Sequence, residues 1–437
     1  MELRVDPKSI AYLIVFLFGE DGSARVAYTD AAPETVSQPV IIRPSGFFAP
    51  GVFGTAATMP ALPLEQWHGV PLLFGRPAER WEQGKLIVEA DIIASVFFLV
   101  SRYEERINPA RDAHGRFPGK VSLPYRAGFL DRPIAEEYAA ALAEIAAAHG
   151  IPFERRCSGF DRIWLTHDVD IPWEHLSANA AIRRMGGILK REHRLRLFPI
   201  LNVLGFPERD PHYTFSAMQA LDARLPAATP VYFFKSGGTA KPQDAFVYIR
   251  SRAARRLIRR LRRGGALLGY HASFSAGADP AQIAQELKTL RAVSGDAITC
   301  NRNHYLNSRA PQDFHALIRN GITDDFTMGY ADVVGFRLGT CRAVRWIDPE
   351  NGELTSLLLH PLTIMEATLS GAQYMALDEQ GMRDVSKTLV DAVWRFHGEL
   401  TLLWHNQSVM AGNVNRAVYV ELLSYLVQLT TDQAKDV

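Results

Sequence analysis

The stretch WLTHDVDIPW, residues 164–173, places a histidine and two aspartates at the end of a short apolar run. Alternate side chains of an extended segment share a face, so Asp168 and Asp170 point the same way, roughly 6.5 Å apart, and His167 points away from both. Two carboxylates this close repel each other, so a metal ion or a basic partner is expected beside them. One aspartate can hold the cation, and the other can accept a proton from water that the cation has made more acidic.

Other apolar runs end on residues of the same kind. GALLGY is followed by His271, AITCN leads to Arg302 and His304, and LTLLW is followed by His405. Imidazole and carboxylate together suit zinc, nickel, cobalt or iron, whereas an all-oxygen set suits magnesium or calcium. The pattern therefore predicts one divalent metal site, with zinc as the first choice.

The segments that must position these residues alternate between strands and helices. The strand candidates are RIWLT, TPVYFFK, GALLGY, AITCN, GITDDF, LTSLLLH and LTLLWH, and the helix candidates between them include RAARRLIRRLRR, PAQIAQELKTLRAV and VSKTLVDAVWRF. Such alternation predicts a parallel sheet with both faces covered. About seven units favour a closed or nearly closed barrel over an open sheet, and a barrel carries its chemistry at the carboxyl ends of its strands.

The chain before this region has a different pattern. AYLIVFLFG is a strand candidate, VEADIIASVFFLVSRYEER a helix, and IAEEYAAALAEIAAAHG a second helix that ends at Gly150. The segment IPFERRCSG then marks a boundary near residue 155. We therefore expect a smaller mixed α/β accessory domain over residues 1–155 and an α/β barrel domain over residues 156–437.

Composition excludes several classes of protein. With 437 residues, a formal charge of +1, 47% hydrophobic and 22% charged residues, the chain has ordinary globular composition and gives no support to a general nucleic-acid or membrane-surface binder. The arginine-rich segment RSRAARRLIRRLRRGG, residues 250–265, has apolar residues at helical spacing, which predicts an outer helix with a charged face.

The cysteines and the apolar runs bear on location. Cys157, Cys300 and Cys341 are unpaired in spacing, which favours a reducing compartment. The first residues lack a basic patch followed by an apolar run, and IIASVFFLVS is about half the length that spans a bilayer. We expect a cytoplasmic protein with no secretory signal and no transmembrane segment.

The motifs THDVD, GYHASFS, NRNHYL and LLWHN, in this order, resemble those of the polysaccharide deacetylases of carbohydrate esterase family 4. The resemblance covers roughly residues 158–410, and the segment before it resembles an extra N-terminal domain of a bacterial subgroup with variant motifs. It implies a distorted (β/α) barrel of about seven strands, a divalent metal cofactor and an acylated saccharide as substrate.

The resemblance also implies a role for each matching residue. These roles are a catalytic base at Asp168, a metal-binding acid at Asp170, a metal-binding histidine at His271, an arginine that orients the base at Arg302, a backbone N–H facing the oxyanion at Tyr305, and a general acid at His405. The reverse assignment of the two aspartates stays open.

Two positions depart from the family pattern. Ser275 stands where the family has a second metal-binding histidine, and His304 stands where it usually has proline. Because one histidine is lost and another gained at the same rim, we hypothesise that His304 replaces the missing ligand, with Ser275 beside the site. Asp325 is a further candidate, as a partner of His405.

The function expected from these features is metal-dependent removal of an acyl group, with N-acetyl as the leading case, from a sugar in a bacterial polysaccharide or envelope glycan pathway. Two alternatives remain open. One is a catalytically degenerate barrel that binds a glycan or acts as a scaffold, motivated by Ser275. The other is metal-dependent hydrolysis of a different amide C–N bond.

Overall fold

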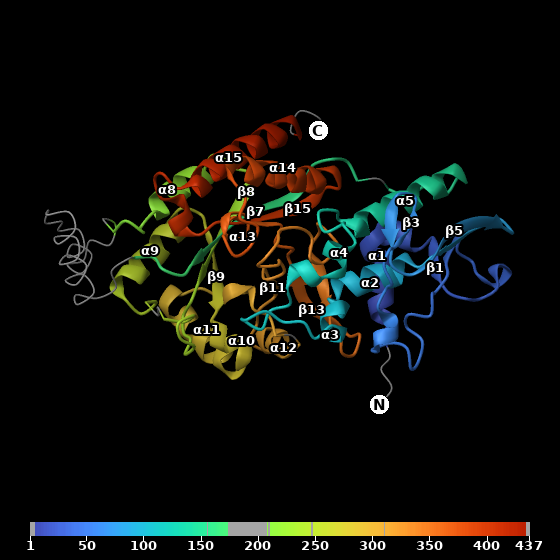
Figure 1. Ribbon diagram of the computed structural model, residues 1–437, viewed down its shortest axis with the longest axis horizontal. Coiled ribbons are helices and arrows are strands. Elements are labelled where there is room, and N and C mark those ends of the chain that lie inside the picture. Colours follow the sequence, from blue (N-terminus) through green and yellow to red (C-terminus); the bar gives the residue numbers. More distant parts are fainter. Residues whose placement is uncertain are drawn as a thin grey trace, which may run out of the picture. The chain divides into compact units, whose positions relative to one another are not determined.

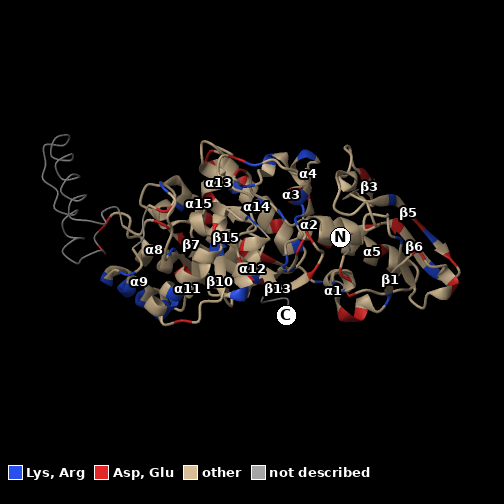
Figure 2. Ribbon diagram, turned by 90° about the horizontal axis from the view of Figure 1, so that it is seen from below, with Lys and Arg blue, Asp and Glu red and all other residues tan. Residues whose placement is uncertain are grey.

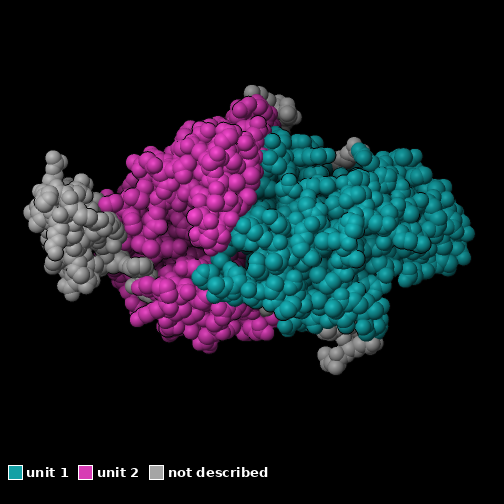
Figure 3. Space-filling model, viewed as in Figure 1, with its two compact units in different colours: residues 1–161, 328–363, 388–400 teal, residues 162–327, 364–387, 401–437 magenta. Residues whose placement is uncertain are grey.

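The computed structural model describes residues 5–154, 156–173, 208, 210–245, 248–309 and 311–433. The chain is a mixed α/β protein, traced in Figure 1. It divides into two compact units, coloured separately in Figure 3: unit 1 comprises residues 1–161, 328–363 and 388–400, and unit 2 comprises residues 162–327, 364–387 and 401–437. The boundary expected near residue 155 lies close to the first division, but unit 1 also contains two later segments that the sequence prediction gave to the barrel.

Unit 1 contains a four-stranded sheet in the order β1-β2-β6-β5, a two-stranded ribbon and a β12–β13 hairpin. Its strands are β1 (Val26–Tyr28), β2 (Val40–Ile42), β3 (Glu65–Trp67), β4 (Val70–Leu72), β5 (Gly75–Glu82), β6 (Lys85–Ala90), β12 (Val344–Ile347) and β13 (Leu354–Leu359). Its helices are α1 (Pro7–Ser23), α2 (Ile92–Val100), α3 (Tyr103–Ile107), α4 (Leu123–Arg126) and α5 (Ile134–Ala148), with 3₁₀ turns η1 (Pro33–Thr35), η2 (Ala56–Thr58) and η3 (Gly119–Val121).

The first helix corrects one sequence prediction. The run AYLIVFLFG, expected to be a strand, lies inside α1. Asp6 caps this helix by accepting a hydrogen bond from the backbone N–H of Lys8, and Pro7 occupies its first turn, where a missing N–H costs nothing. A short, wholly apolar run has no clear period, so these two capping signals carried the information instead.

The alanine-rich helix predicted for this region is confirmed, whereas the segment VEADIIASVFFLVSRYEER begins in β6 and forms two helices, α2 and α3, separated at Arg102, whose φ is 60°. Asp91 caps α2 through the backbone N–H of Ala94, and all nine residues of α2 are buried. The alanine-rich helix α5 ends before Gly150, whose φ of 75° is one that glycine adopts without strain. No described helix is long and apolar enough to cross a membrane.

The buried carboxyl of Glu104 in unit 1 gives a prediction about stability. Its Oε2 accepts a hydrogen bond from the backbone N–H of Leu123 at 2.7 Å, whereas its Oε1 is buried with no hydrogen-bond partner in the described chain. Burial raises the pKa of Glu104 to about 7. The folded state therefore holds this proton more tightly than the unfolded state, and the free energy of unfolding falls as the pH rises from about 4.5 to 7.

We expect Glu104→Gln to be more stable than the native chain at pH 8, by roughly 1–3 kcal/mol, because the amide keeps the hydrogen bond but never ionises. At pH 4 the two proteins should be nearly equal in stability. Denaturant unfolding at both pH values measures this, with the exposed Glu34→Gln as the control. Equal stability at pH 8 would mean that ionisation of the Glu104 carboxyl does not destabilise the folded state.

Unit 2 contains most of the strand and helix pattern read from the sequence. Its strands run in the order β11-β10-β9-β8-β7-β15-β14, as part of a nine-stranded curled sheet, and the pairs from β7 to β11 and β14–β15 are parallel. They are β7 (Phe160–Val169), β8 (Ala228–Phe234), β9 (Leu267–Ala272), β10 (Cys300–Asn303), β11 (Asp324–Asp325), β14 (Ile364–Met365) and β15 (Gly398–Leu403).

Helices follow these strands along the chain. They are α8 (Phe215–Asp222), α9 (Arg252–Arg263), α10 (Phe274–Ala278), α11 (Ala281–Ser294), α12 (Gln312–Arg319), α13 (Glu366–Ser370), α14 (Glu379–Arg395) and α15 (Val414–Gln433), with 3₁₀ turns η5 (His304–Leu306) and η6 (Asn406–Val409). Helices α9 and α11 both pack on β9. The arginine-rich helix α9, largely blue in Figure 2, buries Ala254, Leu257, Ile258 and Leu261, and its arginines are exposed, as expected for an outer helix.

The sheet agrees with the predicted barrel in part. Its strands in unit 2 form an open, curled series, a half-barrel that is consistent with a distorted barrel, and a closed barrel of seven strands is not seen among the described residues. The run LTSLLLH, counted among the parallel strands, forms β13, which pairs antiparallel with β12 within unit 1. The apolar residues of a strand do not encode the direction of the strand that pairs with it.

Candidate active site

The carboxyl ends of several unit 2 strands bring their polar residues together. Asp168 and Asp170 end β7, His271 lies near the end of β9, Arg302 lies in β10 and His304 begins η5 directly after it, Glu366 follows β14, and His405 follows β15. In the parallel β9–β10 pair, His271 and Arg302 are register partners. Parallel strands place their carboxyl ends at one edge, which is why residues so distant in sequence meet.

The guanidinium of Arg302 holds Asp168 from inside the sheet. Its Nη1 donates to Oδ1 of Asp168 at 3.1 Å and to Oγ1 of Thr166 at 2.7 Å, and its Nε donates to the carbonyl oxygen of Phe326 at 3.0 Å. The guanidinium carbon also lies 4.7 Å from the ring centre of Phe233. Although burial lowers the pKa of Arg302, its normal value is so high that the group stays charged and faces a carboxylate.

Asp170, His271 and His304 form a compact set of possible metal ligands. One ligand atom from each lies within 4.8 Å of the other two. Nε2 of His271 is 3.2 Å, and Nε2 of His304 is 3.3 Å, from Oδ1 of Asp170. Burial opposes ionisation of Asp170, but the two histidines lower the pKa of this carboxyl well below its usual range.

The other hydrogen bonds of the two histidines decide what this set can bind. Nδ1 of His271 lies 2.9 Å from the carbonyl oxygen of Arg302, which only accepts, so Nδ1 carries the proton. Nδ1 of His304 faces Oδ1 of Asp244 at 3.4 Å in the same way. In their neutral forms both rings therefore aim the lone pair of Nε2 at Oδ1 of Asp170, an oxygen buried without a hydrogen bond. Three converging acceptors need a cation between them, so these residues fit a divalent metal ion.

Asp244 connects His304 to Ser275, the position of the missing histidine. The backbone N–H groups of Phe274 and Ser275 donate to the two oxygens of Asp244 at 2.9 and 3.0 Å. Burial raises the pKa of this carboxyl, but the bond from His304 and these two backbone bonds outweigh burial and bring the pKa to about 2. Ser275 therefore lies beside the site as expected, and it supports His304 through an acid that the sequence analysis did not identify.

His405 stands on the other side of Asp170. Its Nε2 lies 3.7 Å from Oδ2 of Asp170, and its Nδ1 lies 2.7 Å from Oε1 of Glu366. The same Glu366 oxygen accepts the backbone N–H of His405 at 2.8 Å and the hydroxyl of Ser408 at 2.8 Å. Burial lowers the pKa of His405, but Glu366, and more weakly Asp170 and Asp168, raise it to about 10.

The partner of His405 is therefore Glu366 in place of the expected Asp325. Asp325 lies on β11, with β10, β9, β8 and β7 between it and β15. It accepts hydrogen bonds from Asn301 at 2.7 Å and from the backbone and hydroxyl of Thr327, both at 2.9 Å. Burial raises the pKa of Asp325 to about 6 despite these bonds.

Tyr305 has an unusual backbone at the place where the sequence predicts an oxyanion contact. Its φ of 64° and the φ of 53° at Leu306 lie in the left-handed region, which costs energy in residues other than glycine. The ring of Tyr305 packs against Phe274 and His304, with centroids 5.6 and 4.7 Å apart. These contacts hold the strained turn that follows the ligand candidate His304.

His167 points away from the two aspartates, as alternation along the strand predicts. Its Nδ1 lies 2.8 Å from the carbonyl oxygen of Trp404, and its Nε2 lies 3.1 Å from Oδ2 of Asp222. The hydroxyls of Tyr232 and Tyr419 also donate to Asp222, at 3.2 and 2.7 Å. This buried cluster joins strands β7 and β8 to helices α8 and α15, so His167 has a packing role.

Two residues of the site had only weak signals in the sequence. Glu366 follows β14, a strand of two residues that is too short to show a period. Asp244 lies in the loop after β8, two residues after Pro242, in a segment with no recognisable motif. An acid after a short apolar run was the available signal for Glu366, and Asp244 had none.

Comparisons with known proteins give one matching family and several similar solved structures, two of which are described here. Residues 9–149 match a family of unknown function, DUF7033, which covers the leading part of the chain. No curated protein matches. A structure of a protein described as a polysaccharide deacetylase, from Mycobacterium smegmatis, is similar at 11% identity and a TM-score of 0.38, over 63% of this chain and 88% of that one.

The second similar structure is the Xyl-CE4 domain of a multidomain xylanase from the hindgut metagenome of Trinervitermes trinervoides. The identity is 12% and the TM-score 0.28, over 63% of this chain and 85% of that one. Because both TM-scores are low, the interpretation of the site depends on its own residues and their geometry.

Proposed function

We propose that unit 2 is a metal-dependent hydrolase that removes an acyl group, with N-acetyl as the leading case, from a saccharide. The observation that carries this proposal is the convergence of Asp170, His271 and His304 on one point beside a second carboxylate, Asp168, which Arg302 orients. A ligand set next to a separate base is the arrangement that metal-assisted hydrolysis needs. The saccharide comes from the resemblance of the motifs to those of polysaccharide deacetylases.

In this proposal, Asp170, His271 and His304 hold a divalent ion, with zinc as the first choice because two of the three ligands are imidazoles. The bound ion would supply a Lewis acid and make an attacking water more acidic. Every other role falls to residues of the chain itself.

Asp168 accepts the proton of the attacking water. Arg302 fixes the direction of this carboxylate, since its Nη1 donates to Oδ1 of Asp168 at 3.1 Å. The backbone N–H of Tyr305 is proposed to donate to the oxygen on which negative charge develops.

His405 donates a proton to the departing amine or alcohol. Glu366 lies against its Nδ1 and so orients the ring and stabilises its protonated form, leaving Nε2 directed at the site. A carboxylate that positions a histidine while the opposite nitrogen transfers the proton is a common arrangement in catalysis.

The test of this function is a release assay on the metal-loaded protein with four classes of substrate: N-acetylated saccharides, O-acetylated saccharides, linear amides and cyclic amides. Acyl release from the N-acetylated saccharides, abolished by chelation and restored by zinc, is the expected result. Turnover of amides alone would favour hydrolysis of a different C–N bond. Saccharide binding with no turnover and no bound metal would favour the non-catalytic alternative.

Asp244 allows a separate prediction on metal affinity. Asp244→Asn keeps the size of the side chain but removes the charge that holds Nδ1 of His304, so the Kd for zinc should rise about 10- to 100-fold. Competition with a chromogenic chelator measures this. The control is Asp279→Asn, an acid that follows α10 and contacts Gln282 and the backbone of Ala281. An unchanged Kd would remove Asp244 from the proposed site.

A further inference from the structure

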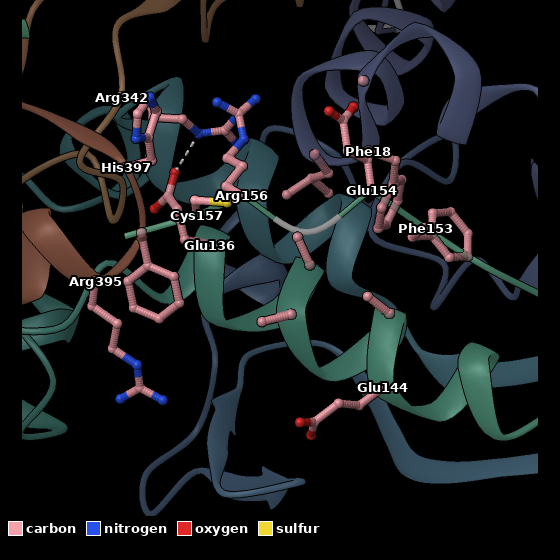
Figure 4. A pocket seen from close by; sticks show the side chains of 16 residues that line it. Phe18, Glu136, Glu144, Phe153, Glu154, Arg156, Cys157, Arg342, Arg395 and His397 are labelled. Carbon is pink, nitrogen blue, oxygen red and sulfur yellow. Dashed lines mark hydrogen bonds and ion pairs between the residues drawn. The ribbon is translucent and has the colours of Figure 1, made fainter. Parts of the chain in front are cut away.

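Unit 1 contains a cavity that has no part in the proposed reaction (Figure 4). Its volume is about 590 Å³, which is in the range of cavities that bind small molecules. The lining residues come from α1, from α5, from the segment after α5 and from two later segments of unit 1: Leu17, Phe18, Gly19, Glu136, Ala139, Ala140, Ala143, Glu144, Phe153, Glu154, Arg156, Cys157, Arg342, Arg395, Phe396 and His397.

The two ends of this cavity differ in chemistry. Phe18 and Phe153 stand at one end, with ring centroids 5.4 Å apart, and the small side chains of α5 form the floor beside them. Arg156, Arg342 and His397 gather at the other end, as Figure 4 shows. The cavity therefore has an aromatic end, where Glu154 also lies, and a cationic end.

The cationic end has more positive charge than its single inner carboxylate balances. Oε1 of Glu136 already accepts hydrogen bonds from Nε of Arg342 at 2.8 Å and from the hydroxyl of Thr340 at 2.6 Å. Its Oε2 faces the backbone N–H of Cys341 at 3.3 Å. Arg342 is thereby fixed in place, and its guanidinium also stacks 4.1 Å from the ring centre of Phe16.

Arg156 lacks such a partner. Among the described residues it makes no hydrogen bond or ion pair, and it is exposed, so a ligand can reach it. Desolvation of its guanidinium and the nearby charge of Arg342 lower the pKa of Arg156, and the carboxylates of Glu136, Asp161 and Glu154 offset this only in part.

His397 provides an independent observation at the same end. Its Nδ1 is buried with no hydrogen-bond partner in the described chain. Its backbone has a φ of 52°, in the left-handed region that a non-glycine residue adopts at a cost. A buried ring nitrogen without a partner is expensive, so the fold carries an unsatisfied polar group at this end of the cavity.

We infer that this cavity binds an amphipathic anion, a molecule with a carboxylate or phosphate group at the Arg156, Arg342 and His397 end and an apolar chain along Phe18, Phe153 and α5. A guanidinium pairs with either kind of anionic group through charge-assisted hydrogen bonds. Unit 1 would then be a ligand-binding unit.

The experiment is calorimetric titration of the full chain with four probes: octanoate, octyl phosphate, octanol and inorganic phosphate. At least one of the two octyl anions should bind about tenfold or more tightly than octanol and than inorganic phosphate, since only these anions occupy both ends. The comparison of octanoate with octyl phosphate distinguishes the two anionic groups.

Two variants locate the binding. Arg156→Gln should weaken binding of the preferred anion about tenfold or more, and Ala140→Phe, which adds a ring to an exposed alanine of the lining, should abolish it. Arg255→Gln, an exposed arginine of α9 in unit 2, is the matched control and should change nothing.

Several results would overturn the inference. These are no binding of either octyl anion by the folded protein, equal binding of octanol or inorganic phosphate, or unchanged binding in both Arg156→Gln and Ala140→Phe. Because both substituted side chains lie on the surface, circular dichroism should show native folding in each variant.

Discussion

Asp168→Asn is expected to lower turnover by roughly 10²- to 10⁴-fold while leaving the metal bound, because the variant loses the proposed base but none of the proposed ligands. Oδ2 of Asp168 lies 3.7 Å from Nε2 of His271, and Asp168 is outside the set that converges on Oδ1 of Asp170. Turnover is measured by acyl release and metal content by mass spectrometry on the same preparation. The matched control is Asp161→Asn, at the exposed start of the same strand.

The asparagine variant also leaves Arg302 buried without its counter-charge, which can cost stability. Asp168→Glu controls for this loss of stability, because it keeps a carboxylate near the Arg302 guanidinium but moves the carboxylate oxygens by one methylene. It should fold, bind metal and turn over more slowly than the native chain. Native turnover in Asp168→Asn would instead transfer the role of base to Asp170, which is the reverse assignment left open by the sequence.

The strand ends of unit 2 were predictable because two simple rules agree there. An apolar run followed by polar residues marks the end of a buried strand, and parallel strands end at one edge. Asp168 and Asp170 from β7, His271 from β9 and Arg302 from β10 are brought together in this way. The hypothesis about His304 used the same logic, since β10 is the neighbour of β9 in the sheet.

The supporting acids and the composition of unit 1 were not predictable by these rules. Glu366 and Asp244 contact His405 and His304, which are distant from them in sequence, and their local sequences have no period. Unit 1 combines segments separated by more than a hundred residues, such as α5 and the β12–β13 hairpin. Such pairings depend on packing between distant parts of the chain, which a local pattern does not encode.

The segment that forms α1 was predicted wrongly for a different reason. Its apolar run satisfies both a buried strand and a buried helix, so hydrophobicity alone gave no decision. Asp6 and Pro7, just before the run, are helix-start residues, and the structure uses both of them as such. Capping signals therefore outweigh the apolar run when the two are read together.

The second prediction concerns how much metal the protein retains. The native chain, loaded with zinc and dialysed, should retain about one equivalent, and Asp170→Ala, His271→Ala and His304→Ala should each retain less than roughly a tenth, because an enzyme zinc site commonly uses three protein ligands. His304→Ala is the decisive variant, since His304 stands in for the histidine that Ser275 replaces. The control is His315→Ala, on α12 in the same unit and outside the ligand set.

Stability offers a second measurement of the same site that does not depend on any substrate. A ligand present at about 100 times its Kd stabilises the folded state by about 2.7 kcal/mol, so chelation should lower the free energy of unfolding of the native chain by about that amount. The three ligand variants should show no such loss on chelation, whereas His315→Ala should show all of it. If His304→Ala keeps both the metal and the response to chelation, then Nε2 of His304 is not a ligand, and its position 3.3 Å from Asp170 reflects an ion pair alone.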